Sequence, residues 1–242
     1  MSRGPRVAVI VFPGTWSDRD FAHAASLLGW EARLVWHAET VLPDPDAVVL
    51  PGGFAHGDYL RTGAIARFSP AMRAVEAFAA AGGPVLGSCN GFQILTEAGI
   101  LPGALLRNDH LEFRCEWQPL RVERAAGPWL GELHPGETIR LPISHGEGRY
   151  FADAAALDEL ERSARVVLRY ADPAGTVNAA ANPNGSLRSI AGIVNERGNV
   201  LGLMPHPERA MEDETGGSDG LRLLRSLDAW LVAQPAVAER RL

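Results

Sequence analysis

The chain has 242 residues and a net charge of −6, and 46% of its residues are hydrophobic, which is enough for the core of one sizeable α/β domain. Because it is acidic and has no block of basic residues, we expect no nucleic-acid partner. It contains no lysine, which excludes Schiff-base chemistry on lysine and the lysine of a phosphate-binding P-loop. Two cysteines cannot form a disulfide framework, and no apolar run is long enough to cross a bilayer. We therefore expect a cytoplasmic protein with no membrane contact.

The first hundred residues alternate between short apolar runs and longer amphipathic segments. Strands are predicted at residues 6–12, 31–36, 47–50 and 84–88, and helices at residues 17–28, 64–68, 70–81 and 91–98. This alternation is typical of a parallel sheet that is covered by helices on both faces.

The pattern changes after about residue 102, where short alternating runs predict antiparallel strands. These runs cover residues 103–106, 111–122, 138–143 and 165–171, followed by a hairpin of residues 189–194 and 200–203 and a helix at 220–232. No repeat or linker interrupts the chain. The sequence therefore predicts a single domain, residues 1–242 with a core at about 6–232, and a frayed end after residue 234.

Cys89 lies in the sequence Gly87-Ser88-Cys89-Asn90-Gly91, which has the form of a nucleophile elbow between a strand and a helix. Glycines are needed there because the chain passes very close to itself, and the start of the helix favours a thiolate. The Asn90 amide is placed to bind an oxyanion. A buried structural cysteine is the alternative. The other cysteine, Cys115, has no such setting and is interpreted as a packing residue.

A nucleophilic thiol needs a nearby base, and the base needs a carboxylate that orients it. His206 is the best candidate, because it follows the apolar run at 200–204 and Glu208 is close enough to reach its ring. His145, in a glycine-rich loop, is the competing candidate. A metal bound by these three residues and Glu147 is a further alternative, but their spacing matches no common zinc pattern, so we expect no metal.

Residues 51–54 (PGGF) follow the third predicted strand. Paired glycines let backbone N–H groups approach a ligand, so the amides of Gly53 or Phe54 could complete an oxyanion hole. An ordinary turn is the alternative.

Together these motifs resemble the class I (triad) glutamine amidotransferases. Within this family, the chain most resembles the glutaminase subunits of phosphoribosylformylglycinamidine synthases. The resemblance covers most of residues 6–232. The stretches that carry it are residues 12–15 (FPGT), 18–20 (DRD), 57–61 (GDYLR), 91–93 (GFQ), 142–150 (PISHGEGRY), 182–186 (NPNGS) and 198–209 (GNVLGLMPHPER). One departure is Trp16-Ser17, where that group usually has Asn-Cys.

The resemblance implies a flavodoxin-like, open and mostly parallel sheet with helices on both faces and added antiparallel strands. It also implies that glutamine is hydrolysed to glutamate and ammonia through a thioester on the nucleophilic cysteine. The implied roles are a triad of Cys89, His206 and Glu208, an oxyanion hole from Gly53, Phe54 and Asn90, and substrate contacts from Gly52, Gln93 and His145.

The resemblance further implies partners. Ammonia would pass to a separate synthetase subunit (PurL-like) that holds ATP and Mg, with a small PurS-like subunit in the complex, and this chain would hold no cofactor itself. The missing P-loop lysine agrees with that division of labour. Two alternatives stay open: a cysteine hydrolase or chaperone of the PfpI type, and a non-catalytic regulatory subunit.

Overall fold

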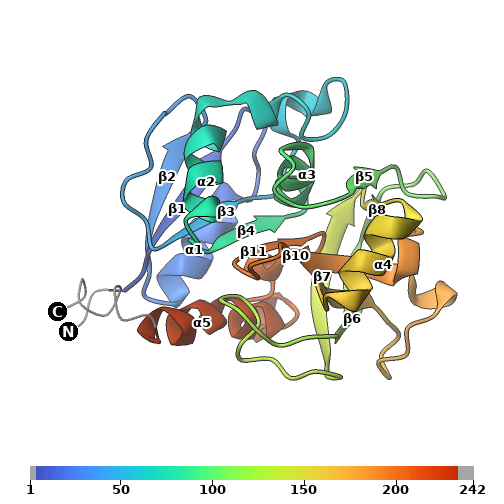
Figure 1. Cartoon of the computed structure of the whole chain (residues 1–242). Coiled ribbons are helices and arrows are strands. Elements are labelled where there is room, and N and C mark those ends of the chain that lie inside the picture. Colours follow the sequence, from blue (N-terminus) through green and yellow to red (C-terminus); the bar gives the residue numbers. More distant parts are fainter. Residues whose placement is uncertain (1–3, 234–242) are drawn as a thin grey trace.

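The computed structural model describes residues 4–233, and one mixed sheet of nine strands runs through them. The strands of this sheet are β1 (Arg6–Val11), β2 (Glu31–Trp36), β3 (Ala47–Leu50), β4 (Val85–Ser88), β6 (Arg114–Val122), β7 (Thr138–His145), β9 (Val166–Tyr170), β10 (Ile190–Val194) and β11 (Val200–Leu203). Their order is β2-β1-β3-β4-β11-β10-β9-β6-β7 (Figure 1). A small second sheet pairs β5 (Ala104–Leu106) with β8 (Arg149–Phe151).

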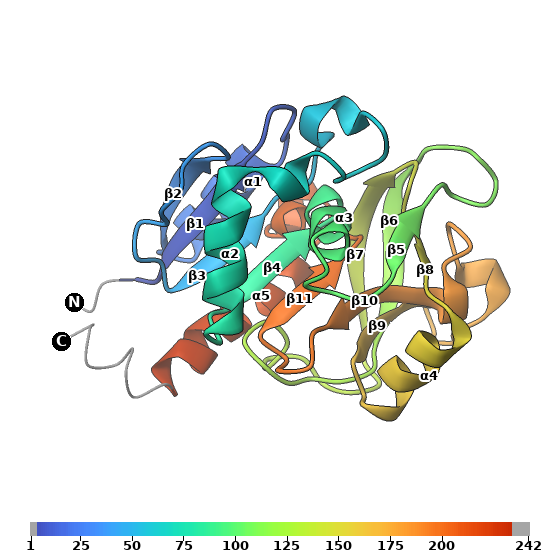
Figure 2. The ribbon, with the colours of Figure 1, turned by 45° about the horizontal axis from the view of Figure 1, so that its top comes forward.

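The first half of the sheet is parallel, from β2 to β11, and has helices on both faces. Its helices are α1 (Asp18–Leu27), α2 (Pro70–Ala80), α3 (Asn90–Glu97) and α5 (Asp219–Val232). Successive side chains of a strand point to opposite faces. Val7 and Val9 of β1 therefore pack in the core under α1 and α5, whereas Ala8 and Ile10 pack under α2 and α3. Figure 2 shows α2 and α3 on one face of the parallel strands.

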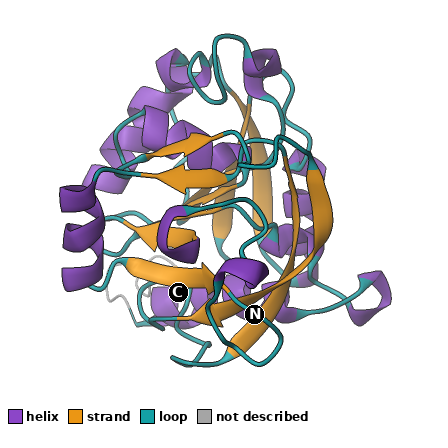
Figure 3. Ribbon diagram, turned by 90° about the vertical axis from the view of Figure 1, so that its right-hand side faces the viewer, coloured by secondary structure: helices purple, strands orange, loops and turns teal. Residues whose placement is uncertain are grey.

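The second half, from β11 to β7, is antiparallel, as the alternating runs predicted. Figure 3 shows the long, curved strands of this half from the side. One of its faces is covered by residues 123–137, which contribute Trp129, Leu130 and Leu133 to the core. The other face is covered by α4 (Ala154–Arg162), through Leu157 and Leu160.

The predicted elements and the structure differ in a few places. The sequence analysis did not predict β8 or α4, and residues 64–68 form only a short 3-10 helix, Ala66–Phe68. The strand predicted from residue 111 begins at Arg114. The predicted frayed end after residue 234 lies outside the described residues. Within residues 4–233, no helix has the length and apolar character needed to cross a membrane.

The order of the strands decides where a site can form. β4 lies between β3 and β11 and is parallel to both, so the chain leaves all three strands at the same edge of the sheet. The segments that follow them begin at Pro51, Cys89 and Met204. Ligand sites in open α/β sheets gather at this carboxyl edge, and the predicted site residues come together there.

Candidate active site

Cys89 forms a sharp turn between β4 and α3. Its backbone angles are φ 50° and ψ −108°, a left-handed conformation that side chains rarely adopt. A Cβ atom on Gly91 would lie 1.9 Å from the Leu50 carbonyl oxygen, and one on Gly87 would lie 2.7 Å from the Gly91 backbone. The two glycines are therefore required by the close passage of the chain, as the elbow motif predicted.

The Cys89 thiol is buried and faces β7. Its sulfur lies 3.6 Å from the carbonyl oxygen of Ser144, to which it donates a weak hydrogen bond. The backbone of Cys89 is also fixed, because its N–H donates to Leu203 O in the neighbouring β11 at 2.8 Å. Cys89 caps the first turn of α3, whose free N–H groups favour negative charge on the sulfur.

His206 and Glu208 form a buried pair beside this cysteine. The imidazole Nδ1 lies 2.6 Å from Oε1 of Glu208, and that oxygen also accepts a 3.2 Å hydrogen bond from the Ser88 hydroxyl. Burial by itself would lower the pKa of His206, but the negative charges of Glu208 and Cys89 raise it to about 10. Cys89 is thus close enough for its charge to act on the ring, and the imidazole can hold the proton of the thiol.

The position of His206 is set by two contacts of the segment after β11. Its N–H donates to Pro142 O at 2.8 Å, which ties the segment to β7. Its ring packs on Gly52, where a Cβ atom would lie 2.5 Å from the imidazole Cε1. The structure places Gly52 against the imidazole, and its expected contact with the substrate stays a prediction.

Two backbone amides are available near the sulfur. Asn90 is the first residue of α3, so its N–H has no partner within the helix. Gly53 is paired with Thr15 through an isolated bridge, and the backbone at Gly14 and Thr15 leaves no room for a side chain there. In contrast, the Phe54 N–H donates to Gly14 O at 2.9 Å. In this structure the predicted oxyanion donor Phe54 is therefore occupied, whereas no hydrogen bond of the Gly53 N–H is found among the described residues.

A cavity of about 330 Å³ opens beside Cys89. It is lined by Trp16, Gly53, Phe54, Cys89, Phe113, Ser144, His206 and Arg209. The three residues predicted to contact the substrate do not line this cavity. Gln93 has its amide engaged at both ends, because Oε1 accepts from Asn90 at 2.8 Å and Nε2 donates to Glu147 O at 2.6 Å. It links α3 to the loop after β7.

His145, the competing base in the sequence, ends β7 and is buried. Its Nε2 lies 3.5 Å from the Asn184 amide nitrogen, and a Cβ on Gly148 would lie 2.4 Å from its Nδ1. Burial and the positive charge of His206 lower the pKa of His145 to about 3, so its ring is neutral at neutral pH. The Ser144 carbonyl, and not the His145 ring, is the hydrogen-bond partner of the Cys89 thiol. Residues 4–233 contain no group of three or more His, Cys, Asp or Glu side chains that could hold a metal ion.

The sequence analysis missed a cluster of polar residues around the triad. Arg209 lines the cavity and donates to Ser17 Oγ at 2.8 Å and to Asp20 at 3.0 Å. It therefore ties the segment that carries His206 to the start of α1. The stretches DRD and HPER marked two of these residues as part of a family pattern, but nothing in the sequence placed them together.

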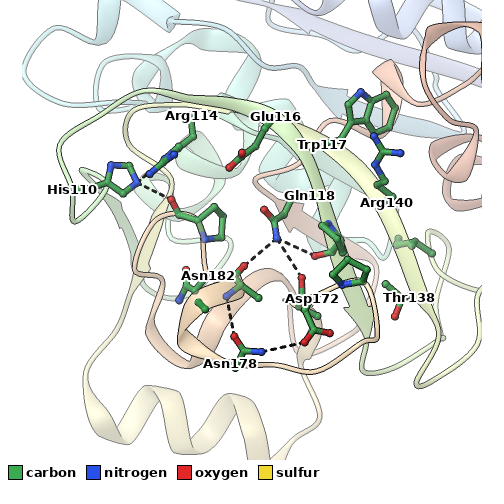
Figure 4. A pocket seen from close by; sticks show the side chains of 17 residues that line it. His110, Arg114, Glu116, Trp117, Gln118, Thr138, Arg140, Asp172, Asn178 and Asn182 are labelled. Atoms are coloured by element: carbon green, nitrogen blue, oxygen red, sulfur yellow. Dashed lines mark hydrogen bonds between the residues drawn. The ribbon is translucent and has the colours of Figure 1, made fainter.

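A larger cavity, of about 980 Å³, lies between β6, β7 and residues 171–183 (Figure 4). Figure 4 shows Arg140 beside Trp117, with its guanidinium 4.9 Å from the ring centroid. Neither Cys89 nor His206 lines this cavity, so size alone does not identify the site.

The interpretation of Cys115 as a packing residue is wrong, because Cys115 is exposed on β6. β9 pairs only with residues 120–122 of β6, so the first half of this strand lies at the margin of the sheet, where its side chains are less covered.

Comparisons with known proteins agree with this geometry. Residues 4–217 match the family model of the CobB/CobQ-like glutamine amidotransferase domain. A phosphoribosylformylglycinamidine synthase subunit PurQ from Gloeobacter violaceus is 57% identical over 229 residues, which cover 94% of this chain and 99% of that protein. The PurQ subunit from Thermomicrobium roseum is 57% identical over 92% of this chain and 94% of its own.

A solved structure gives the same result. A chain in the structure of PurLQS from Thermotoga maritima superposes with a TM-score of 0.84 at 42% identity, covering 96% of this chain and 100% of that one. A second Thermotoga maritima structure, of a glutamine amidotransferase, has a TM-score of 0.57 at 17% identity and supports the fold alone. The resemblance inferred from the motifs is confirmed, and so is the α/β fold with a parallel core and added antiparallel strands. The chain belongs to the family of CobB/CobQ-like glutamine amidotransferases, and within it to the group of PurQ subunits of phosphoribosylformylglycinamidine synthase.

Proposed function

We propose that this chain is the glutaminase subunit of phosphoribosylformylglycinamidine synthase in purine biosynthesis, and that Cys89, His206 and Glu208 are its catalytic residues. The observation that carries the proposal is the buried His206–Glu208 pair, joined at 2.6 Å and coupled in charge to a cysteine on a strained elbow. Because one sheet runs from β2 to β7, we propose that the chain acts as a single amidotransferase domain.

The chemistry follows from these positions. His206 holds the thiol proton, and the Cys89 thiolate attacks the side-chain carbonyl carbon of glutamine. The amides of Gly53 and Asn90 bind the oxyanion that forms. The C–N bond then breaks as His206 gives its proton to the departing nitrogen, which leaves ammonia and a glutamyl thioester. His206 next takes a proton from water, the hydroxide attacks the thioester, and glutamate leaves as the thiolate returns.

Ammonia has to reach a second active site. We propose that the synthetase subunit covers the cavity mouth, because Trp16, Phe54 and Phe113 line the cavity and are 70%, 41% and 52% exposed. Exposed aromatic residues around a concave site are typical of protein interfaces. The PurLQS complex from Thermotoga maritima supports PurL-like and PurS-like partners.

The division of labour completes the proposal. ATP and Mg are expected on the synthetase subunit, and this chain is expected to hold no cofactor and to work in the cytoplasm. The lack of lysine, and with it of a P-loop lysine, supports this assignment. A PfpI-type hydrolase and a non-catalytic subunit are disfavoured, because the relatives are PurQ subunits and Cys89, His206 and Glu208 are all present in this chain.

The test uses the complex reconstituted with the synthetase and the small subunit. Cys89→Ala should abolish synthesis driven by glutamine and leave synthesis driven by added ammonium unchanged. Diazo-oxo-norleucine, a glutamine analogue that alkylates nucleophiles, should label Cys89 in the wild-type complex. Loss of both syntheses would assign Cys89 a structural role, and absence of labelling in the assembled complex would refute the glutaminase proposal.

A further inference from the structure

The turn formed by residues 144–148 has an unusual support. It begins with the last two residues of β7, the last strand of the sheet, which is paired with β6 alone. Yet this turn contacts the site twice: the Cys89 thiol donates to Ser144 O at 3.6 Å, and Gln93 donates to Glu147 O at 2.6 Å. The sheet holds Ser144 from one side only, through its pairing with Cys115 of β6, because no strand lies beyond β7.

Asn108, which lies between β5 and β6, holds the turn on one side. It is fully buried. Its backbone N–H donates to Gly146 O at 2.9 Å, its Nδ2 donates to His145 O at 3.0 Å, and its Oδ1 accepts from the Gly148 N–H at 3.0 Å. Its second amide hydrogen is used by Glu112 O at 2.8 Å. One side chain thus satisfies several backbone groups that a buried turn could not leave unpaired.

Asn184, which lies far from Asn108 in the sequence, holds the same turn. It is also fully buried. Its Nδ2 donates to Gly148 O at 2.9 Å and reaches the Tyr170 hydroxyl at 3.2 Å, and its Oδ1 accepts from the Ser186 N–H at 3.0 Å. The two asparagines therefore bind the N–H and the C=O of one residue, Gly148. We call Asn108 and Asn184 the asparagine clamp.

The held carbonyl has a chemical use. In the thiol form, Ser144 O accepts the S–H of Cys89. Once His206 takes that proton, the carbonyl lies beside a thiolate and needs another donor. The carboxamide of glutamine carries an NH₂ group that can serve as this donor, whereas the corresponding ester carries none.

We propose that Asn108 and Asn184 are positioning residues that hold the Ser144 carbonyl beside Cys89, where it accepts a hydrogen bond from the carboxamide NH₂ of glutamine. The inference rests on the proposed glutaminase function and adds to it the means by which the site selects an amide over an ester.

The experiment compares Asn108→Ala and Asn184→Ala in the complex reconstituted with the synthetase and small subunits. Three rates are measured: synthesis driven by glutamine, synthesis driven by ammonium, and hydrolysis of a γ-glutamyl ester. We expect kcat/KM for glutamine to fall about tenfold or more, which is the effect of one well-placed hydrogen bond. Ester hydrolysis should fall clearly less, and synthesis from ammonium should not change.

Asn199→Ala is the matched control. Asn199 is also buried and donates to Ala79 O and Gly83 O at 2.9 and 2.7 Å, but it precedes β11 and so lies at the opposite edge of the sheet. This variant should lose thermal stability as the clamp variants do and keep the wild-type ratio of glutamine to ester turnover.

Two results would overturn the inference: an unchanged rate with glutamine, or equal losses with glutamine and ester. If the alanine variants fail to assemble, Asn108→Asp provides the test. The introduced aspartate keeps a side-chain oxygen that can accept from the Gly148 N–H, but it has no N–H to donate to His145 O. This variant should also have a lower ratio of kcat/KM for glutamine to kcat/KM for the ester than the wild type. An unchanged ratio would refute the proposed role of the clamp. Failure of the clamp is distinct from failure of the proposed function, which Cys89→Ala tests.

Discussion

The His206 imidazole and the Glu208 carboxylate meet at 2.6 Å through Nδ1 and Oε1, with both side chains buried. A buried carboxylate at this distance fixes the tautomer of the ring and stabilises its protonated form. Nε2 of His206, on the ring edge away from Glu208, makes no well-aligned hydrogen bond among residues 4–233. The pair therefore leaves one ring nitrogen free for chemistry.

Glu208→Gln should lower glutamine turnover by about 100-fold or more at neutral pH. The substitution removes the charge that raises the pKa of His206 and leaves the burial that lowers it, so less imidazolium forms. Synthesis from glutamine, measured against pH in the complex, checks this, with synthesis from ammonium as the assembly control. Glu214→Gln, at an exposed position, should match the wild type. A wild-type pH profile in Glu208→Gln would contradict the proposed role.

Gly52→Ala should reduce glutamine turnover by about tenfold or more, because its Cβ would lie 2.5 Å from Cε1 of His206 and must displace the ring. Gly131→Ala is the control, since its Cβ would meet only Gly127 O at 3.6 Å and its φ is ordinary. That variant should keep full activity. Alkylation of Cys89 by iodoacetamide reports whether the elbow is intact. Equal activity of the two variants would show that the His206 ring tolerates the methyl group of Ala at position 52.

The sequence predicted the parts of the site that depend on local backbone geometry. Gly87 and Gly91 mark the elbow, because only glycine tolerates contacts as short as 1.9 Å, and the apolar runs around them place Cys89 at a strand end. It did not predict α4, whose buried face rests on Leu157 and Leu160 and whose other positions are alanines and charged residues. A helix with so short an apolar stripe gives a weak periodic signal.

The residues expected to contact the substrate make tertiary contacts that the sequence did not predict. Gln93, His145 and Gly52 each contact a residue that lies far away in the sequence, and the substrate contacts expected of them stay predictions. The order of the strands decides which segments of the chain lie near the site. The direction in which a side chain points depends on tertiary contacts, which a local sequence pattern does not predict. The same holds for Asn108 and Asn184, whose importance appears only when their hydrogen bonds to residues 144–148 are known.

Acid should unfold the wild type more readily than a variant without His145. The pKa of His145 is about 3 in the folded protein, whereas an exposed histidine in the unfolded chain has the ordinary value of 6.5. Between these two pH values the unfolded state therefore binds a proton that the folded state does not. The neutral His145 therefore adds to the free energy of unfolding above pH 6.5. This contribution is lost as the pH falls toward 3, at up to about 1.4 kcal/mol per pH unit. Urea unfolding of His145→Gln between pH 7 and 4 should show a shallower dependence. Exposed His134→Gln should keep the wild-type slope, and equal slopes for both variants would contradict the buried, neutral His145.

Trp16→Asp should weaken binding of the synthetase subunit by about tenfold or more, the usual effect at a large aromatic contact. Trp16 is 70% exposed at the cavity mouth, and its ring meets that of Phe54 edge to face at 5.8 Å. A partner that seals the cavity against loss of ammonia must cover this pair, and the substitution would replace an aromatic contact with a carboxylate that loses its hydration on binding. Trp36→Asp is the matched control, because Trp36 is 47% exposed on the outer strand β2. Titration calorimetry with the synthetase subunit gives both dissociation constants. If Trp36→Asp weakened binding as much as Trp16→Asp, the cavity mouth would not be the docking face.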